Sequence, residues 1–298
     1  MKKNSLTQRL CAAPHVVWSA IFIVVPLIMV IYYAFTDKSG AFTLENIGRL
    51  SDYTSTFLRS LWFGIVATII CLIIAYPLAY ILSKMKLRAQ STMVMLVMIP
   101  MWMNFLLRTY AWMTLLEDSG VINNILSVIG VGPFHMINTS GAVILGMVYN
   151  FLPYMILPIY SVMTKLDNSL VEAAQDLGAD KFHVIRDVIF PSTLSGVVSG
   201  VTMVFVPSVS TFYISQKLGG GSFALIGDII EMQFQVSNNF NFGAALSFVL
   251  MILILICMAV MNKFGDTEEA GGVVACIINS IPLQKSTLRL LCFSCICR

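Results

Sequence analysis

Long apolar runs separated by short polar segments dominate the pattern of the chain. A helix needs ~20 mostly apolar residues to cross a bilayer. Six segments qualify or nearly qualify: Val16–Phe35, Leu61–Leu82, Thr92–Leu116, Gly141–Met163, Val188–Ile214 and Ala244–Met261. These runs lack the alternation of barrel strands, and a helix satisfies its backbone hydrogen bonds within its own segment. The pattern therefore predicts an all-α, polytopic membrane protein with six transmembrane helices.

The composition supports a membrane protein. Of the 298 residues, 58% are hydrophobic and 11% are charged, and the mean hydropathy is +0.85. A soluble domain carries roughly 25% charged residues. The chain cannot cover a water-facing surface of its size, so we expect membrane lipid as its solvent. The net charge of +3 is small and dispersed, and it does not indicate nucleic acid.

The distribution of lysine and arginine predicts the orientation. With the N-terminus inside, ten of these residues fall on the inner side: Lys2, Lys3, Arg9, Lys84, Lys86, Arg88, Lys165, Lys181, Arg186 and Lys263. Four fall in outer loops: Lys38, Arg49, Arg59 and Lys217. We expect cytoplasmic tails at 1–15 and 265–298, the second outside the fold, and one membrane domain over 16–264. No small-x-small cleavage site follows the first apolar run, so that run is expected to be retained.

The segment 168–191 is polar and lies between the fourth and fifth predicted spans. Ser169 and Glu172 have capping-box spacing, with Asp167 as a competing cap. One apolar face follows at helical spacing: Leu170, Ala173, Ala174 and Leu177. A short amphipathic helix is therefore predicted.

A turn and a second helix are expected after it. Gly178 stands where a left-handed residue ends a helix, and Asp180 can cap the next one. Pro191 lies close to where that helix turns into the membrane. The segment is therefore predicted to form a helical hairpin, after which the chain re-enters the bilayer.

The hairpin resembles the signature cytoplasmic loop of permease subunits of bacterial ABC importers. The likeness rests on Glu172-Ala173-Ala174, on Gly178 and on the apolar-x-apolar-Pro ending at Pro191, although Val188 and Phe190 stand where that family has Ile and Leu. The resemblance implies a type I ABC importer transmembrane domain in a bacterial inner membrane, with 168–191 as the coupling segment.

Specific roles follow from the resemblance. Ala173, Ala174 and Leu177 would pack into a cleft of a separate ATP-hydrolysing subunit, Glu172 would fix orientation, and Gly178 would provide the turn. The implied assembly contains a second, homologous permease, two copies of the ATPase and an extracytoplasmic substrate-binding protein.

A narrower likeness, over roughly 16–264, is to permeases of spermidine/putrescine importers. It is carried by Phe42–Asn46, Pro100–Asn104 with Arg108 and Tyr110, Leu166-Asp167, Phe212-Tyr213, Gly219-Gly220, Leu225–Gly227, Gln233-Phe234 and Phe242–Ala245. It implies a polyamine cargo and a polyamine-binding protein as partner. Gln216 departs from the pattern, because an acidic residue is expected there.

Spans four and five offer candidates for the translocation path of a cation. They are Tyr149, Asn150, Tyr154, Ser208, Ser210, Thr211, Phe212 and Tyr213. Aromatic faces attract cations, but the same residues also suit ordinary helix packing. Arg108 is expected to snorkel to the outer interface, with a role in gating as the alternative.

The outer segment Ser215–Gly243 contains an amphipathic stretch that predicts a short interfacial or re-entrant helix. Asp228 and Glu231 on it are candidates for docking a binding protein or meeting substrate, and plain solvation is an equal alternative. In the fifth span, Gly196-x-x-x-Gly200 predicts a close helix–helix approach, with a partner helix that the sequence does not identify.

Several kinds of chemistry are missing from the sequence. It has no Gly-x-x-x-x-Gly-Lys-Ser/Thr phosphate loop, no nucleophile–base constellation, and three isolated histidines. Cys292-x-x-Cys295-x-Cys297 lacks a second ligand pair. We expect a transport subunit that is not an enzyme, with no cofactor and no metal. The alternatives are an ABC permease for ferric iron, sulfate or molybdate and, more distantly, an ion-coupled secondary carrier.

Overall fold

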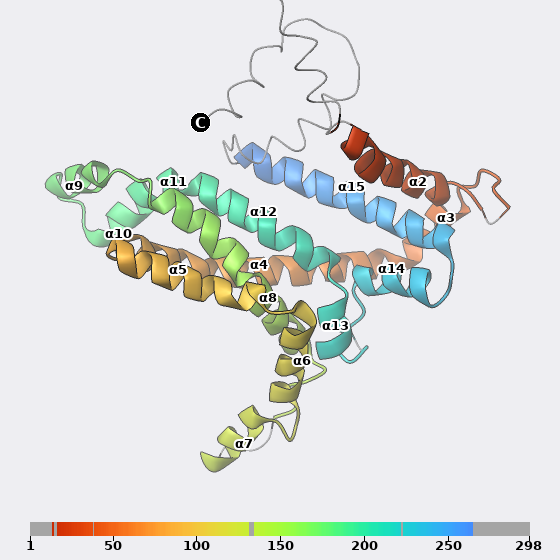
Figure 1. Cartoon of the computed structure of the whole chain (residues 1–298), viewed down its shortest axis with the longest axis horizontal. Helices are drawn as coiled ribbons and strands as arrows, with labels where there is room; N and C mark the ends of the chain where they lie inside the picture. Colours follow the sequence, from red (N-terminus) through yellow and green to blue (C-terminus); the bar gives the residue numbers. More distant parts are fainter. Residues whose placement is uncertain (1–13, 15–16, 38, 131–133, 222, 265–298) are drawn as a thin grey trace, which may run out of the picture.

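A computed structural model describes residues 14, 17–37, 39–130, 134–221 and 223–264 (Figure 1). The predicted tail at 265–298 and nearly all of the tail at 1–15 lie outside these residues. Helices joined by turns and short irregular segments dominate the described part, which also has an isolated antiparallel bridge between Thr36 and Phe42. The predicted all-α fold is confirmed.

Seven longer helices form the body of the molecule: α2 (Val25–Ala34, preceded by a π-helical turn over Ala20–Val24), α4 (Thr54–Ser83), α5 (Leu87–Trp102), α6 (Phe105–Leu116), α8 (Ser140–Met163), α12 (Leu194–Ser210) and α15 (Phe240–Phe264). Short helices connect them: α3 (Glu45–Gly48), η2 (Arg49–Tyr53), α7 (Val121–Val128), α9 (Asn168–Asp176), α10 (Lys181–His183), η3 (Val184–Ile189), α11 (Phe190–Ser192), α13 (Tyr213–Leu218) and α14 (Ile226–Gln235).

Four continuous helices within the described residues are long and apolar enough to cross a membrane: Val17–Ala34, Glu45–Ser83, Ser140–Met163 and Phe240–Met261. Two further pairs qualify only as bent spans, which brings the number to six. The first, second, fourth and sixth predicted spans agree with these helices, although the second begins earlier than predicted. The third and fifth spans were wrongly predicted as single helices.

The third span breaks after Trp102, where the chain turns by 89° into α6. Met103 is extended, and the Asn104 side chain accepts a hydrogen bond from the Leu106 N–H at 2.8 Å. An asparagine cap starts a new helix in a new direction. α6 and α7 therefore leave the bundle at a steep angle (Figure 1).

The fifth predicted span is divided at both ends. Lys181–Ser192 and Leu194–Ser210 meet at an angle of 68°. At the other end Thr211 is extended, and α13 begins as a separate helix. Of the helices that make up the fifth predicted span, only α12 runs through the bundle.

The core lies where α4, α8 and α12 pack together. α4 contributes small, fully buried residues at every fourth position: Ala67, Cys71, Ala75 and Ala79. Their small side chains allow neighbouring helices to approach closely. Cys71 thus behaves as a small hydrophobic residue of the core. α15 packs beside α2 through Ala34, Ala244 and Ala245, and Figure 1 shows these two helices side by side.

The Gly196-x-x-x-Gly200 motif faces α8 of the same chain, which identifies its partner helix. A Cβ at Gly196 would lie 2.9 Å from the Pro158 carbonyl oxygen, and one at Gly200 would lie 2.8 Å from Met155 Sδ. α12 and α8 are therefore in backbone contact at this crossing.

Replacing Gly196 with leucine is expected to destabilise this crossing. The new side chain must displace the α8 backbone, and overpacking of this kind costs ~1–3 kcal/mol or more. We expect a lower thermal unfolding temperature for the purified protein. The control is Gly48→Leu, because a Cβ at Gly48 has no heavy atom within 4 Å. Equal unfolding temperatures for the two variants would contradict the close contact.

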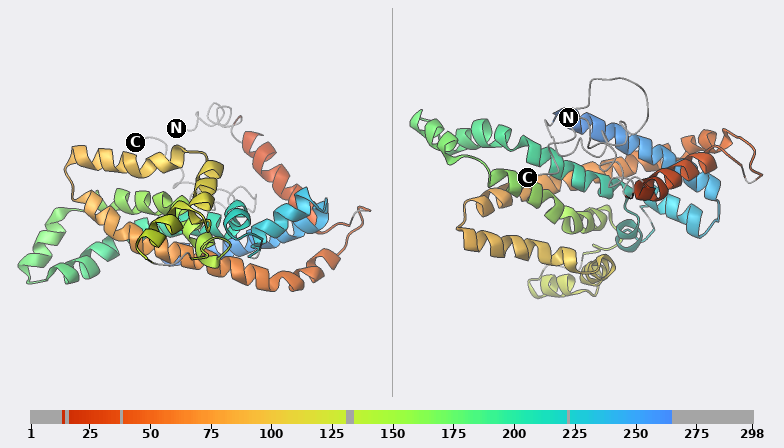
Figure 2. Two further views of the ribbon diagram at one scale, coloured as in Figure 1. Left: turned by 90° about the horizontal axis from the view of Figure 1, so that it is seen from below. Right: turned by 45° about the horizontal axis from the view of Figure 1, so that its top comes forward.

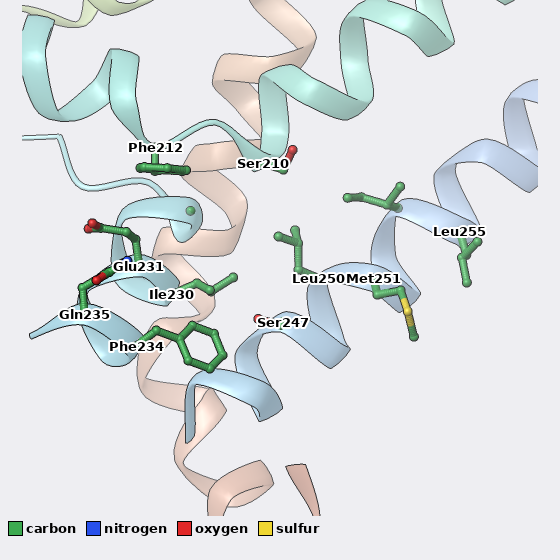
Figure 3. Close-up of a pocket in the computed structure, with 12 residues that line it drawn as sticks. Ser210, Phe212, Ile230, Glu231, Phe234, Gln235, Ser247, Leu250, Met251 and Leu255 are labelled. Carbon is green, nitrogen blue, oxygen red and sulfur yellow. The ribbon is translucent and has the colours of Figure 1, made fainter. Parts of the chain in front are cut away.

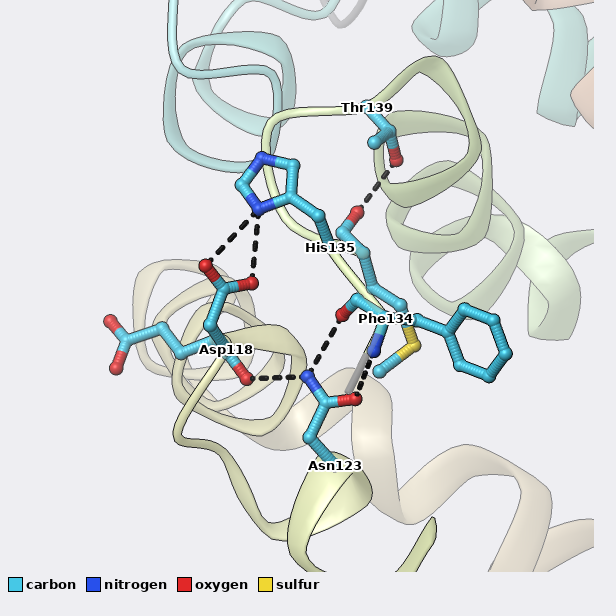
Figure 4. Close-up of polar contacts among 7 residues, drawn as sticks. Asp118, Asn123, Phe134, His135 and Thr139 are labelled. Carbon is cyan, nitrogen blue, oxygen red and sulfur yellow. Dashed lines mark hydrogen bonds and ion pairs between the residues drawn. The ribbon is translucent and has the colours of Figure 1, made fainter. Parts of the chain in front are cut away.

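The segment between α6 and α8 is folded back on itself by polar contacts (Figure 4). The Asn123 amide donates to the Phe134 carbonyl at 2.9 Å and accepts from the Phe134 N–H at 2.9 Å. His135 Nδ1 lies 3.0 Å from Asp118 Oδ1. These contacts position α7 and the start of α8.

Candidate functional site

The predicted coupling segment protrudes from one end of the bundle, and α14 lies toward the other (Figures 1 and 2). Asp167 is the cap of α9: its carboxylate accepts a hydrogen bond from the Ser169 N–H at 2.9 Å, which lowers the pKa of Asp167. Ser169 lies inside the first turn. The capping-box reading of Ser169 is therefore wrong, and the competing cap is correct.

The turn after α9 has the predicted form. Gly178 has φ +86°, in the left-handed region. The Gly178 N–H donates to the Gln175 carbonyl at 2.9 Å, and the Ala179 N–H donates to the Ala174 carbonyl at 3.1 Å. This pair of bonds is a Schellman motif, which strongly favours glycine at the left-handed position.

The apolar face of α9 is uncovered. Leu177 is 89% exposed and Leu170 is 50% exposed. Ala173 and Glu172 are also exposed, and Ala174 is half-buried. Single exposed apolar residues are common, but a whole helical face on a protruding hairpin is the usual form of a surface that a partner covers.

The second half of the segment connects this face to the bundle. The Asp180 carboxylate accepts from the His183 N–H at 2.9 Å and lies 2.6 Å from His183 Nδ1, so it caps α10 as predicted. That contact lowers the pKa of Asp180 and raises that of His183. Pro191 is exposed in the first turn of α11, directly before the 68° bend.

At the bend, Thr193 is buried and hydrogen-bonded. Its hydroxyl donates to the Ile189 carbonyl at 2.8 Å and lies 3.2 Å from the Tyr76 hydroxyl of α4. The hairpin is therefore linked both to α12, by the chain, and to α4, by a side-chain contact.

The predicted path residues do not all come together. Tyr149 of α8 contacts Trp112 of α6, with ring centres 5.2 Å apart. Asn150 is buried, and its amide donates to the Gly146 carbonyl at 2.8 Å while Oδ1 has no partner among the described residues. Tyr154 is exposed on α8. The hydroxyl of Ser208 is buried and donates within α12 to Val204.

Tyr213 belongs to an aromatic cluster that sequence reasoning missed. Its ring centre lies 6.0 Å from that of Phe105 and 6.2 Å from that of Tyr110. The Lys217 ammonium lies 5.4 Å from the centre of the Tyr110 ring and 5.9 Å from that of Tyr213. The i, i+4 spacing of Tyr213 and Lys217 is the one local signal that was available.

Arg108 does not snorkel. It is 7% exposed, its guanidinium carbon lies 5.9 Å from the centre of the Phe105 ring, and Nε and Nη1 have no hydrogen-bond partner among the described residues. The expectation is wrong because α6 runs at 89° to α5. On α6, Arg108 is buried beside Phe105 and does not lie at the interface expected for a straight helix.

Asp228 and Glu231 have different surroundings. Asp228 is 8% exposed, and its carboxylate accepts from the Leu225 N–H at 2.7 Å and from the Ser215 hydroxyl at 2.9 Å. Burial raises its pKa to about 6, against the opposing effect of these hydrogen bonds. Asp228 thus holds the start of α14 and does not present an exposed charge for docking.

Glu231 is half-buried and accepts a hydrogen bond from the Gln216 amide at 3.0 Å. It lines a cavity of about 530 Å³ together with the predicted path residues Ser210 and Phe212 (Figure 3). The structure therefore brings three predicted site residues into one cavity. The described residues contain no cluster of three potential metal ligands.

The pKa of Asp228 gives a testable pH dependence. Because its folded-state pKa is raised from 3.8 to about 6, its protonated form stabilises the fold below about pH 4, and that contribution is lost as pH rises through 6. We expect the unfolding temperature of the protein to fall, relative to Asp228→Asn, as pH increases from 4 to 7. Thermal unfolding of both proteins across this range measures the difference, and parallel curves would contradict it.

Comparison with known proteins places the chain in a family. Residues 75–267 match the family model described as binding-protein-dependent transport system inner membrane component. The chain is 36% identical over 270 residues to the spermidine/putrescine transport system permease protein PotB of Haemophilus influenzae, covering 87% of this chain and 94% of that protein. It is 37% identical over 246 residues to PotB of Escherichia coli K12, covering 79% and 90% respectively.

The fold has a counterpart among solved structures. A chain of a bacterial alginate ABC transporter, solved in complex with an alginate pentasaccharide-bound periplasmic protein, matches with a TM-score of 0.71 at 16% identity, over 88% of this chain and 94% of that one. The fold is thus that of a type I ABC importer transmembrane domain. The chain belongs to the family of binding-protein-dependent transport system inner membrane components.

Proposed function

We propose that this chain is a permease subunit of an ATP-driven importer of polyamines, with spermidine or putrescine as cargo. The observation that carries the proposal is the 36% identity to a spermidine/putrescine permease over 94% of that protein. The fold alone would not select a cargo, because the alginate transporter shares it.

The exposed apolar face of α9 supports a docking role. In the proposed assembly, Ala173, Ala174 and Leu177 enter a cleft of a separate ATPase subunit, and Glu172 orients the helix. Gly178 then reverses the chain, so that the α10–Pro191 segment connects the docked helix to α12.

We propose a complex of this chain, a second homologous permease, two ATPase subunits and an extracytoplasmic polyamine-binding protein. The α9 end of the bundle then faces the cytoplasm, and the α14 end faces the binding protein. In this assembly the chain hydrolyses no ATP itself. Closure of the ATPases moves the α9 helices together and switches the opening of the membrane path from inside to outside.

Uptake in a strain lacking its own polyamine importers tests this function. Expression of this chain with its proposed partner subunits is expected to restore accumulation of labelled spermidine or putrescine, and sulfate, molybdate and ferric iron are not expected to compete. Restored uptake of one of those solutes without polyamine uptake would contradict the cargo. Uptake that persists without the ATPase subunit would contradict the class.

A further inference from the structure

The cavity at the end of α12 has walls from three helices (Figure 3). Its lining residues come from the end of α12 and the segment after it, from α14 and from α15. The volume of about 530 Å³ lies within the ~300–1,000 Å³ of small-molecule sites.

The serine hydroxyl groups in this wall already donate their hydrogen bonds within their own helices. The Ser210 hydroxyl donates to the Val206 carbonyl at 3.0 Å, and the Ser247 hydroxyl donates to the Gly243 carbonyl at 2.9 Å. A serine hydroxyl has a single proton to donate and two lone pairs to accept with. Toward the cavity, both groups are therefore left as acceptors.

Glu231 adds a negative charge. Its Oε2 accepts from the Gln216 amide at 3.0 Å, so the neighbour is neutral and the charge is not cancelled by that contact. No lysine, arginine or histidine is among the residues that line this cavity. Apart from the Gln235 amide, the polar side chains of the wall thus accept hydrogen bonds, and one of them is charged.

The remainder of the wall is hydrocarbon and aromatic. Phe212 and Phe234 contribute rings, and α15 contributes an aliphatic strip of Leu250, Met251, Ile254 and Leu255. An alkylammonium ion is the chemical complement of this wall. Its head donates three hydrogen bonds and accepts none, aromatic faces attract it, and its methylene groups suit an aliphatic surface.

We propose that this cavity is a binding subsite for one end of a linear polyamine, with the ammonium group on the Glu231 carboxylate and the methylene chain along α15. The subsite deepens the proposed function and rests on it. Ser210 and Ser247 lie in the α12 and α15 parts of the wall, apart from the Glu231 carboxylate (Figure 3), and offer acceptors to other amino groups of the polyamine. A lipid acyl chain is the competing occupant, and it carries no positive charge that could pair with the Glu231 carboxylate.

The test is equilibrium binding of labelled spermidine to the complete permease–ATPase complex in nanodiscs, without the binding protein. Affinity then reports on the membrane subunits alone. Glu231→Gln keeps the size of the side chain and an acceptor for Gln216 but removes the charge. Because hydrogen bonds to a charged group are stronger than those to a neutral one, we expect a roughly 10- to 100-fold weaker Kd.

A matched control removes a carboxylate elsewhere. Glu45 is exposed on α3, and it does not line the cavity. Glu45→Gln is expected to bind spermidine like the wild type. Ser247→Leu, which narrows the cavity without changing charge, is expected to weaken binding as well. Co-purification of the ATPase and basal ATP hydrolysis check that each variant is assembled.

The outcomes separate the subsite from the function. If the wild-type complex neither transports nor binds spermidine or putrescine, the proposed cargo is wrong. If it transports spermidine while Glu231→Gln binds as tightly as the wild type, only the subsite is wrong, and the cavity holds lipid or a neighbouring helix. Transport without measurable binding in the absence of the binding protein also contradicts the subsite.

Discussion

Replacing Gly178 with proline is expected to abolish polyamine uptake and association with the ATPase. Gly178 has φ +86°, and its N–H donates to the Gln175 carbonyl. Proline fixes φ near −65° and has no N–H, so the turn cannot form and the α9 face is displaced. Gly178→Ala, which can keep the hydrogen bond but strains the backbone by ~1–2 kcal/mol, is expected to give an intermediate loss.

The matched control for this variant is Gly130→Pro. Gly130 also has a positive φ, of 79°, directly after a helix, and its N–H donates to the Ser127 carbonyl at 3.1 Å. It lies in the segment after α7, away from the hairpin. Gly130→Pro is expected to retain the ATPase in pull-down from membranes. Loss of the ATPase from both variants, or from neither, would contradict a specific role for the α9 turn.

Introducing a charge at Leu177 is expected to produce the second large effect. Leu177 is 89% exposed in this chain, so Leu177→Glu costs little in the isolated subunit. If the side chain is buried on docking, the substitution removes ~1.5–3 kcal/mol of apolar burial and adds the cost of desolvating a carboxylate. We expect the ATPase to bind at least 10- to 100-fold more weakly.

Val128→Glu provides the comparison. Val128 is 87% exposed at the end of α7, so the two substitutions put the same charge on equally exposed apolar positions. Titration of the purified ATPase against nanodiscs that contain each variant measures both affinities. Weaker binding with Leu177→Glu alone supports docking through α9, whereas equal affinities would show that Leu177 remains in water.

The features that could be predicted from sequence are local ones. The α9 turn depends on a glycine, the start of α10 depends on Asp180, and the fourth span depends on an uninterrupted apolar run. Each is fixed by residues within a few positions of one another. The short helix in Ser215–Gly243 was foreseen for the same reason, because its apolar and polar residues alternate at helical spacing.

The features that were missed depend on contacts between distant segments. Asp228 is buried and accepts from Ser215 and Leu225, and the start of its helix is held against α4, because the Ile226 N–H donates to the Ser60 hydroxyl at 2.7 Å. The spacing of Asp228 and Glu231 in the sequence does not show that Asp228 is a buried helix cap and that Glu231 lines a cavity. The cavity itself exists only once α12, α14 and α15 are packed together.

The broken third span shows a different limit. Hydropathy averages over a window, so a run of apolar residues reads as one helix even where the chain turns by 89°. The signal was present in Asn104, a residue that favours helix starts. The burial of Arg108 depends on the direction of α6, and the sequence pattern does not predict that direction.

This membrane subunit is expected to import polyamine only with work supplied by a separate ATPase through α9. Transport into proteoliposomes measures this requirement. Liposomes that contain both permeases, the ATPase and the binding protein are expected to concentrate labelled spermidine when ATP is supplied on the α9 side. Omitting the ATPase is expected to eliminate accumulation, and spermidine concentrated by this chain alone would contradict the account.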